Sequence, residues 1–205
     1  MEILLIDNDD SFTYNLFHLL CGAGECCCGV NVEVLNCGEA NVESAMRADG
    51  VVLSPGPGLP HENESLMGLV EGLAGRVPIL GVCLGHQALA VHYGARLIHL
   101  SAPCHGDVSC INIKSDGRLF AGIGGQMLVA RYHSWSVGRD GLPEPFQVTA
   151  ETVDGCVMAF EHRSLPLFGV QFHPESFMTP QGKQIIKNYY HAILQFNETA
   201  SRRHV

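Results

Sequence analysis

Short apolar runs that alternate with helix-like patterns are the feature that most constrains how this chain can fold. In the first half, the runs at 3–6, 51–53 and 79–82 contain no charged or polar residue, and the run at 32–35 is apolar except for Glu33, which is typical of buried strands. Helix-like patterns follow them: from an N-cap at Asp10 or Ser11 to about residue 20, at 64–73 and at 84–92. Continuous apolar strands must be covered on both faces, so the pattern predicts a mostly parallel sheet between helices.

The second half is richer in strands. Apolar or alternating runs predict strands at 95–100, 110–113, 127–130, 146–150, 156–161 and 167–172, and a closing helix at 182–196. The extra strands make the sheet mixed. No repeat, low-complexity tract or linker divides residues 1–205, so we expect one α/β domain with an open, mixed, mostly parallel sheet flanked by helices.

Composition narrows the classes of partner. Of 205 residues, 46% are hydrophobic and 16% charged, which argues against disorder. A net charge of −9 is a poor match for nucleic-acid phosphates or anionic membranes, so we expect neither as a partner. The opening MEILLIDNDD has no basic region and no run of 18 apolar residues occurs, which favours a cytoplasmic protein.

The nine cysteines do not form the pattern of a metal site. Cys26, Cys27 and Cys28 are consecutive, whereas zinc knuckles need spaced pairs. An odd number of cysteines also disfavours a complete disulfide framework. We therefore expect no metal and no other cofactor, and interpret the 26–28 cluster as a variable loop without a functional account.

One cysteine differs from the others in its surroundings. Cys83 lies in Gly81-Val82-Cys83-Leu84-Gly85, between an apolar strand and a helix. This spacing is typical of a nucleophile elbow, a sharp turn that exposes the nucleophile at the end of the sheet. The helix N-terminus favours the thiolate, and its free N–H groups, beginning with Leu84, can donate to an oxyanion. A buried structural cysteine is the alternative.

A base for this nucleophile is predicted at His173. It follows the strand at 167–172 and stands two residues before Glu175, with Pro174 between them. Proline favours an extended residue before it, and in an extended segment residues i and i+2 project to one side. His173 can then exchange a proton with Cys83 while Glu175 orients its ring. The alternative is an ordinary turn that ends a strand.

A third segment, Ser54-Pro55-Gly56-Pro57-Gly58, also follows a strand. Because prolines lack an N–H, the glycines Gly56 and above all Gly58 are the candidate donors to a substrate carbonyl. On its own the segment reads more simply as a turn. The ends of parallel strands meet at one sheet edge, so the three segments together predict acyl transfer through a thioester that water hydrolyses.

The motifs GVCLGHQ (81–87), SPGPG (54–58) and GVQFHPES (169–176) resemble those of class I, or triad-type, glutamine amidotransferases, which have a flavodoxin-like fold. The resemblance covers essentially the whole chain. It implies a triad of Cys83, His173 and Glu175, a γ-glutamyl thioester on Cys83, and an oxyanion hole from the N–H groups of Leu84 and Gly58. It also places the glutamine substrate near Gln87, with its amino-acid end at the backbone of Ser134 and Trp135.

The opening LLIDNDDSFTYNL (4–16) narrows the resemblance. It is similar to the small subunits of anthranilate synthase and aminodeoxychorismate synthase, which act in tryptophan and folate biosynthesis. The resemblance implies L-glutamine as substrate, and the partner that it implies is a chorismate-binding synthase large subunit. The two pathways are not distinguished. A stand-alone γ-glutamyl hydrolase and a non-enzymatic binding protein are the alternatives.

Two segments depart from the family pattern. Asp107, in His105-Gly106-Asp107, stands where the family usually has lysine, which leaves coupling to the partner open. The stretch 22–29, which contains the three adjacent cysteines, looks like an insertion after the first helix.

Overall fold

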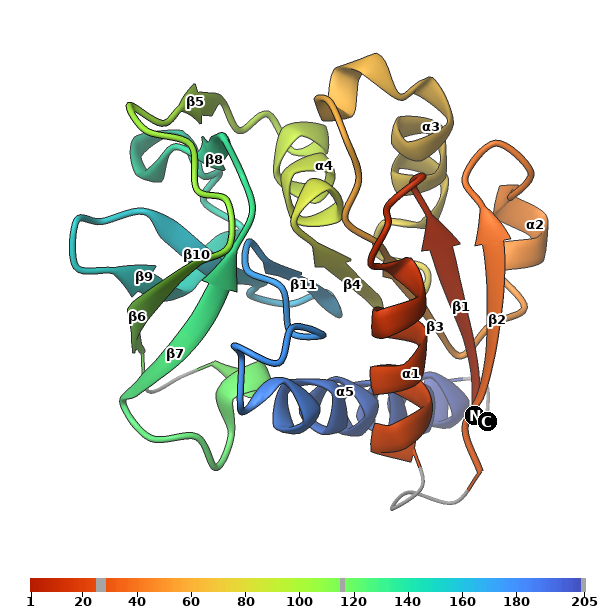
Figure 1. Cartoon of the computed structure of the whole chain (residues 1–205). Helices are drawn as coiled ribbons and strands as arrows, with labels where there is room; N and C mark the ends of the chain where they lie inside the picture. Colours follow the sequence, from red (N-terminus) through yellow and green to blue (C-terminus); the bar gives the residue numbers. More distant parts are fainter. Residues whose placement is uncertain (25–28, 115–116, 204–205) are drawn as a thin grey trace.

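The computed structural model describes residues 1–24, 29–114 and 117–203, without the side chains of residue 139 and residues 200–203. The Cys26–Cys28 cluster therefore lies outside the described residues. Within them, nine strands form one sheet in the order β2-β1-β3-β4-β11-β10-β9-β6-β7. Figure 1 shows this sheet running across the molecule with helices on both sides.

The parallel half of the sheet comes from the strands that sequence predicts first. It contains β1 (Glu2–Asp7), β2 (Asn31–Asn36), β3 (Gly50–Leu53), β4 (Ile79–Val82) and β11 (Leu167–Val170). Each adjacent pair among them is parallel. All residues of β3, β4 and β11 are buried, as expected for strands covered on both faces.

The other half of the sheet is antiparallel. It contains β10 (Val157–His162), β9 (Phe146–Thr152), β6 (Asp107–Ile113) and β7 (Gln126–Arg131). Successive pairs from β11 to β7 are antiparallel. The predicted fold class, a mixed and mostly parallel sheet flanked by helices, is therefore confirmed.

Helices cover the two faces in separate groups. On one face, α1 (Thr13–Gly24) and α5 (Gly182–Arg203) pack against alternate residues such as Ile3 and Leu5 of β1. On the other, α2 (Val42–Ala45), α3 (Glu64–Leu73) and α4 (Leu84–His92) cover Leu4 and Ile6. The alternation of Cβ directions along a strand explains why neighbouring residues enter different cores.

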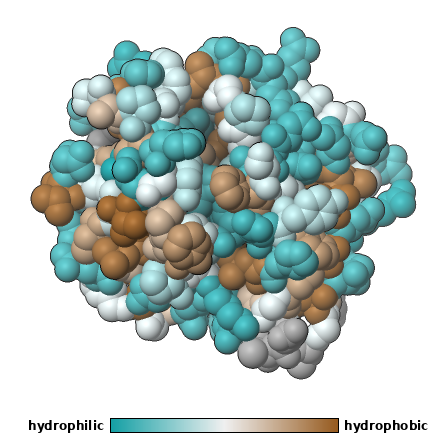
Figure 2. Space-filling view, in the orientation of Figure 1, coloured by the Kyte–Doolittle hydropathy of each residue, from teal (hydrophilic) through white to brown (hydrophobic). Residues whose placement is uncertain are grey.

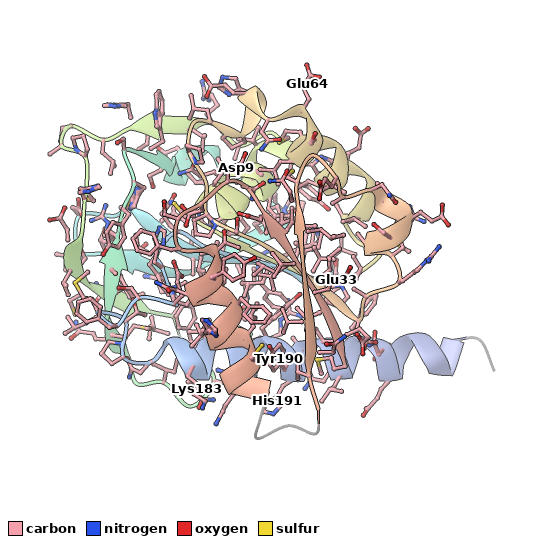
Figure 3. The ribbon with its side chains drawn as sticks, turned by 45° about the vertical axis from the view of Figure 1, so that its right-hand side comes forward. Asp9, Glu33, Glu64, Lys183, Tyr190 and His191 are labelled. Carbon is pink, nitrogen blue, oxygen red and sulfur yellow. The ribbon has the colours of Figure 1, made fainter. Side chains whose placement is uncertain are left out.

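Helix α5 shows how the inner and outer sides of a covering helix differ. Tyr190 is fully buried and its hydroxyl donates to Leu20 O at 2.9 Å. Figure 3 shows Tyr190 beneath α1, whereas Lys183 and His191 of the same helix are exposed. No helix in the described residues is long and apolar enough to cross a membrane.

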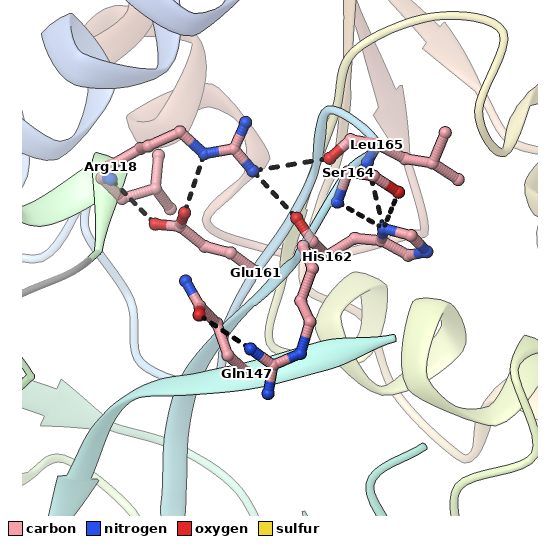
Figure 4. Close-up of polar contacts among 8 residues, drawn as sticks. Arg118, Gln147, Glu161, His162, Ser164 and Leu165 are labelled. Atoms are coloured by element: carbon pink, nitrogen blue, oxygen red, sulfur yellow. Dashed lines mark hydrogen bonds and ion pairs between the residues drawn. The ribbon is translucent and has the colours of Figure 1, made fainter. Parts of the chain in front are cut away.

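An ion pair between a buried glutamate and a partly exposed arginine joins the antiparallel half to the short 3-10 helix η2 (Arg118–Phe120). The fully buried Glu161 accepts hydrogen bonds from Arg118 Nε and Leu119 N, both at 3.0 Å. Arg118 also donates to His162 O at 3.0 Å, as Figure 4 shows. Both carboxylate oxygens are thus satisfied, which offsets the cost of burying the charge.

Several boundaries differ from those expected. The strand predicted at 95–100 is shortened to β5 (Leu97–His99) and pairs with β8 (Trp135–Val137) in a separate two-stranded sheet. Neither β8 nor α2 was predicted, because Ser136 interrupts the three residues of β8 and the four residues of α2 are too short to show a helical period. The last helix continues beyond 196 to Arg203, and the strand predicted at 167–172 ends at Val170.

The surface carries its exposed large hydrophobic side chains in scattered positions, from Tyr14 in α1 to Phe177, which is 91% exposed. On the face in Figure 2, hydrophobic surface forms separate patches between hydrophilic ones. Single exposed apolar residues of this kind are normal for folded proteins.

Candidate active site

The turn at Cys83 joins β4 to α4 with one residue between them. Cys83 has φ 50° and ψ −99°, an unusual backbone conformation for a residue with a side chain. Its N–H donates to Val170 O at 2.9 Å, which ties the turn to β11. The side chain is 6% exposed. The predicted elbow geometry is therefore present.

The glycines on either side make this turn possible. A Cβ on Gly81 would lie 2.4 Å from the carbonyl carbon of Gly85. A Cβ on Gly85 would lie 2.6 Å from Leu53, in the neighbouring strand β3. Both distances are far shorter than carbon atoms tolerate, so the close packing of α4 on the sheet requires glycine at both positions.

His173 is positioned by the antiparallel half of the sheet. Its N–H donates to Ala130 O of β7 at 3.1 Å, and the two residues form an isolated β-bridge. The hydroxyl of Thr179 donates to His173 O at 2.7 Å and accepts from Ala130 N at 3.0 Å. Thr179, which sequence analysis did not single out, thus fastens the backbone of His173 to β7.

Glu175 meets His173 through a turn. Nδ1 of His173 and Oε1 of Glu175 lie 2.6 Å apart, and both side chains are at most 3% exposed. Ser176 N donates to His173 O at 3.3 Å, which closes a four-residue turn with Pro174 in second position. His173 itself is extended, as expected, because it pairs with Ala130, but the expectation that the extended segment continues through Glu175 was wrong. Proline favours the second position of such turns as well, and there too the first and third side chains can meet.

The electrostatic surroundings of His173 favour the protonated ring. Burial lowers the pKa of His173, but Cys83 and Glu175 beside it outweigh burial and raise the pKa to about 10. Nε2 of His173 makes no regular hydrogen bond with a described residue, so this nitrogen is left to act on the sulfur. At neutral pH the ring is therefore poised as a proton donor close to Cys83.

A cavity of about 480 Å³ opens above Cys83. Its walls come from four segments distant in sequence, and they contain all the oxyanion and substrate-binding residues expected from the sequence: Gly56, Gly58, Leu84, Gln87, Ser134 and Trp135. His173 and Glu175 are not among its described lining residues. The structure thus brings the predicted binding residues together around one cavity, with Cys83 in its wall.

The loop that contains Gly56 and Gly58 packs directly on the elbow. A Cβ on Gly56 would lie 2.8 Å from Leu84 Cδ2 and 2.6 Å from Asn8 O. Gly58 has φ 75°, which only glycine adopts without strain. Leu84 is the first residue of α4, so its N–H has no partner within the helix. Two backbone segments with free N–H groups therefore border the cavity next to Cys83.

Sequence analysis missed a group of buried polar residues in and behind this wall. Gln171 is fully buried, and its Nε2 lies 3.6 Å from Cys83 Sγ. Arg131 and His133, at 8% and 5% exposure, are joined by a 3.0 Å hydrogen bond. The signal available for Gln171 was its place two residues before His173, in a strand otherwise apolar.

The residue that departs from the resemblance stands two residues after a segment that lines the cavity. Asp107 is exposed at the start of β6, and its Oδ2 accepts from His105 N at 3.2 Å. His105 itself lines the cavity. The carboxylate of Asp107 is thus turned back onto its own loop. Among the described residues, no group of three or more histidine, cysteine or acidic side chains could hold a metal ion.

Comparison with known proteins gives a consistent result over most of the chain. The family model described as glutamine amidotransferase class-I matches residues 4–193. Aminodeoxychorismate synthase component 2 of Escherichia coli is 40% identical over 92% of this chain and 99% of its own length. Aminodeoxychorismate/anthranilate synthase component 2 of Bacillus subtilis is 40% identical over 91% and 94%.

Some relatives are much longer. The chain spans 32% of the bifunctional protein TrpGD of Thermotoga maritima and 26% of the aminodeoxychorismate synthase of Streptomyces griseus, at 40% and 45% identity. Among solved structures, a candidate GMP synthase subunit from Thermoplasma acidophilum superposes with a TM-score of 0.86 over 98% of both chains. At 24% identity, this last likeness concerns the fold alone.

Proposed function

Because the chain belongs to the class-I glutamine amidotransferase family, we propose that it hydrolyses L-glutamine to glutamate and ammonia with Cys83, His173 and Glu175 as its catalytic triad. The observation that carries this proposal is that Cys83, in the cavity wall, lies beside a histidine that is paired with a buried glutamate. An elbow cysteine lies in the cavity wall, and a histidine whose pKa its neighbours raise to about 10 pairs with a buried glutamate at 2.6 Å.

The first half of the reaction forms a thioester. The Cys83 sulfur attacks the γ-carbonyl carbon of glutamine, and the electron pair of the carbonyl moves to its oxygen. The N–H groups of Gly58 and Leu84 bind this oxyanion. His173 then donates its proton to the amide nitrogen, which leaves as ammonia while the γ-glutamyl thioester remains on Cys83.

The second half returns the enzyme to its starting state. His173, now neutral, takes a proton from a water molecule that attacks the thioester carbon. The sulfur leaves with the electron pair, and glutamate is released. Glu175 holds the ring through Nδ1 in both halves and stabilises its positive charge. Gln87, Ser134 and Trp135, together with Gly56, form the walls that hold the substrate in the 480 Å³ cavity.

The ammonia is delivered to a chorismate-using synthase subunit. The support is the similarity to component 2 proteins of aminodeoxychorismate and anthranilate synthases over nearly their full length. A relative named for aminodeoxychorismate synthase alone and one named for both synthases match this chain at the same 40% identity, so the product is anthranilate or aminodeoxychorismate. The carboxylate of Asp107 is turned onto its own loop. Whether the 105–107 segment contributes to coupling with this partner can be tested with variants of Asp107.

The decisive test uses the chain together with its chorismate-using partner. Cys83→Ser should abolish glutamine-dependent amination of chorismate but leave ammonia-dependent amination intact. Loss of both activities would count against a glutaminase role, because the partner's own chemistry does not need Cys83. The fluorescence of the product distinguishes anthranilate from aminodeoxychorismate. Strong partner-independent cleavage of γ-glutamyl peptides would instead support a stand-alone hydrolase.

A further inference from the structure

A buried side-chain amide contacts the sulfur of Cys83 from the side of the protein interior. Gln171 is fully buried, and its Nε2 lies 3.6 Å from Sγ. Its Oε1 lies 3.1 Å from Nε2 of Gln87, the residue one helical turn after Cys83 in α4. None of the reaction steps proposed above uses Gln171. A buried amide with both ends engaged is well placed to act on the atom it touches.

The direction of each hydrogen bond follows from a backbone carbonyl. Nε2 of Gln87 lies 2.9 Å from Trp135 O, which can only accept. The –NH₂ end of Gln87 therefore faces Trp135, and its second N–H points to Gln171. Gln171 must therefore accept this hydrogen bond with its carbonyl oxygen. Its –NH₂ end is then turned to Cys83, so the amide donates to sulfur.

The hydrogen-bond series that ends at Cys83 begins at the charged side chain of Arg131, which determines the direction of the next bond. Arg131 Nε lies 3.0 Å from His133 Nε2, and a guanidinium only donates, so this ring nitrogen accepts. Burial and the nearby Arg131 lower the pKa of His133 to about 4, so the ring is neutral at pH 7 and carries its proton on Nδ1. Nδ1 lies 2.9 Å from Trp135 O. Two donors thus converge on Trp135 O.

We infer that Gln171 donates a hydrogen bond that stabilises the thiolate of Cys83, and that Gln87 is the positioning residue that fixes this donor's direction. The inference rests on Cys83 being the nucleophile of the proposed function. A hydrogen bond to a charged acceptor is stronger than one to a neutral acceptor, so the contact favours S⁻ over S–H. It also favours S⁻ over the thioester, in which sulfur has given its electron pair to carbon.

This account predicts two opposite effects when the donor is removed. Fewer Cys83 side chains are ionised at a given pH, because the thiolate has lost a partner. Each remaining thiolate is more reactive, because nucleophilicity rises with basicity. A residue that merely holds the strand end in place would not separate these effects, since its loss would lower reactivity at every pH.

The experiment measures the rate at which iodoacetamide alkylates Cys83 as a function of pH, with mass spectrometry of the Cys83 peptide to exclude the other cysteines. Gln171→Met keeps the length of the side chain and removes the donor. We expect the pH midpoint of alkylation to rise by about one unit. The rate on the high-pH plateau should rise about threefold. An unchanged midpoint in a folded variant would overturn the inference.

Two further variants should raise the alkylation midpoint by amounts that differ from that of Gln171→Met. Gln171→Glu still accepts from Gln87 but turns an oxygen to the sulfur, so its midpoint should rise further than that of Gln171→Met. Gln87→Met leaves the sulfur contact itself but removes the constraint on its direction, so a smaller rise is expected. Equal midpoints in all three folded variants would also contradict the proposal.

The other ionisable groups around the sulfur must be the same in all samples. The titratable and charged groups that face this part of the site are His173, Glu175, Asp10, Arg131, His133, Cys104, His105, Glu62 and Tyr132. None of them is altered in the three variants. A change in midpoint between wild type and variant is therefore assigned to the amide.

A measurement on the wild-type protein covers the case in which buried variants do not fold. The side-chain N–H resonances of Gln171 are followed by NMR through the pH range. They should titrate with the midpoint of Cys83 alkylation, and this titration should disappear in Cys83→Ser. If they do not respond, the inference fails even if the glutaminase activity is real. If Cys83→Ser retains glutamine hydrolysis, the proposed function fails instead.

Discussion

Nδ1 of His173 lies 2.6 Å from Oε1 of Glu175, with both side chains almost fully buried. The second carboxylate oxygen of Glu175 has no hydrogen-bond partner among the described residues. The negative charge is thus committed to the imidazole, and it is one of the reasons that the pKa of His173 is raised to about 10. A change in this pair should therefore be seen directly in kcat.

Glu175→Gln should lower kcat for glutamine hydrolysis by about 10²- to 10⁴-fold. An amide can still accept from Nδ1, but it does not stabilise the charged ring, so His173 should titrate at lower pH. The check is the pH dependence of kcat, assayed by ammonia release. Glu64→Gln, an exposed carboxylate at the start of α3, is the matched control, and Figure 3 shows its side chain pointing to solvent. Equal kcat in both variants would contradict the role of Glu175.

Thr179→Val should lower both stability and activity. The hydroxyl bridges His173 O and Ala130 N, so valine leaves a buried donor and acceptor unsatisfied, at a cost of about 1–3 kcal/mol. Because these bonds hold the backbone of His173, kcat should fall while KM for glutamine stays close to that of wild type. Urea unfolding and steady-state kinetics measure the two effects. Thr179→Ser keeps the hydroxyl and should restore both.

Gly81→Ala should prevent folding or strongly destabilise the protein, because the added Cβ would lie 2.4 Å from the backbone of Gly85. The matched control is Gly68→Ala in α3, where a Cβ would meet nothing within 4 Å. There alanine should stabilise the helix by about 0.5–1 kcal/mol. The unfolding temperatures of the two variants should therefore shift in opposite directions. If Gly68→Ala were also destabilised, the effect of Gly81→Ala could not be assigned to the close packing of the elbow.

His86 should make the protein less stable in mild acid. Burial lowers the pKa of this fully buried ring to about 3, and neither ring nitrogen has a regular hydrogen-bond partner among the described residues. In the unfolded chain the ring takes up a proton below about pH 6.5, whereas in the folded chain it stays neutral. Stability is therefore lost as pH falls from 6.5 towards 3, by about 2 kcal/mol per ring at pH 5.

The measurement for His86 compares urea unfolding at pH 7 and pH 5 in wild type and His86→Leu. Leucine fills the space without titrating, so the difference between the two pH values should be about 2 kcal/mol smaller in the variant. His133, whose pKa is also lowered, and the carboxylates contribute equally to both proteins and cancel. An identical pH dependence would show that His86 is not the group responsible.

The sequence predicted the strands that are continuous apolar runs and the helices that are long enough to show a period. Strands β3 and β4 and helices α3 and α4 lie within a residue of their predicted bounds. The short α2 and β8 were missed, although Asn41 and Ser44 form a capping box at the start of α2. β8 consists of three residues whose strand character depends on pairing with β5, a contact that no local pattern encodes.

The predicted site residues gather at one cavity and one turn, but their supports were not predicted. Gln171 and Thr179 act through tertiary contacts with Cys83 and Ala130, and neither residue type signals such a role. The His173–Glu175 contact was predicted for a different reason from the one that holds, since a turn, not an extended segment, brings the two together. The local sequence indicated which residues meet, whereas the backbone conformation that brings them together could be seen only in the folded structure.

At Cys83, the backbone conformation that favours glycine opposes the need for a cysteine side chain, so stability and activity select different residues. A non-glycine residue at φ 50° and ψ −99° is strained, at a cost on the order of 1–3 kcal/mol, and glycine would relieve much of it. A library selected only for resistance to heat should therefore lose its cysteine at position 83, whereas one selected for growth without an external supply of the product should keep it. Position 83 thus holds a residue that its backbone conformation tolerates poorly.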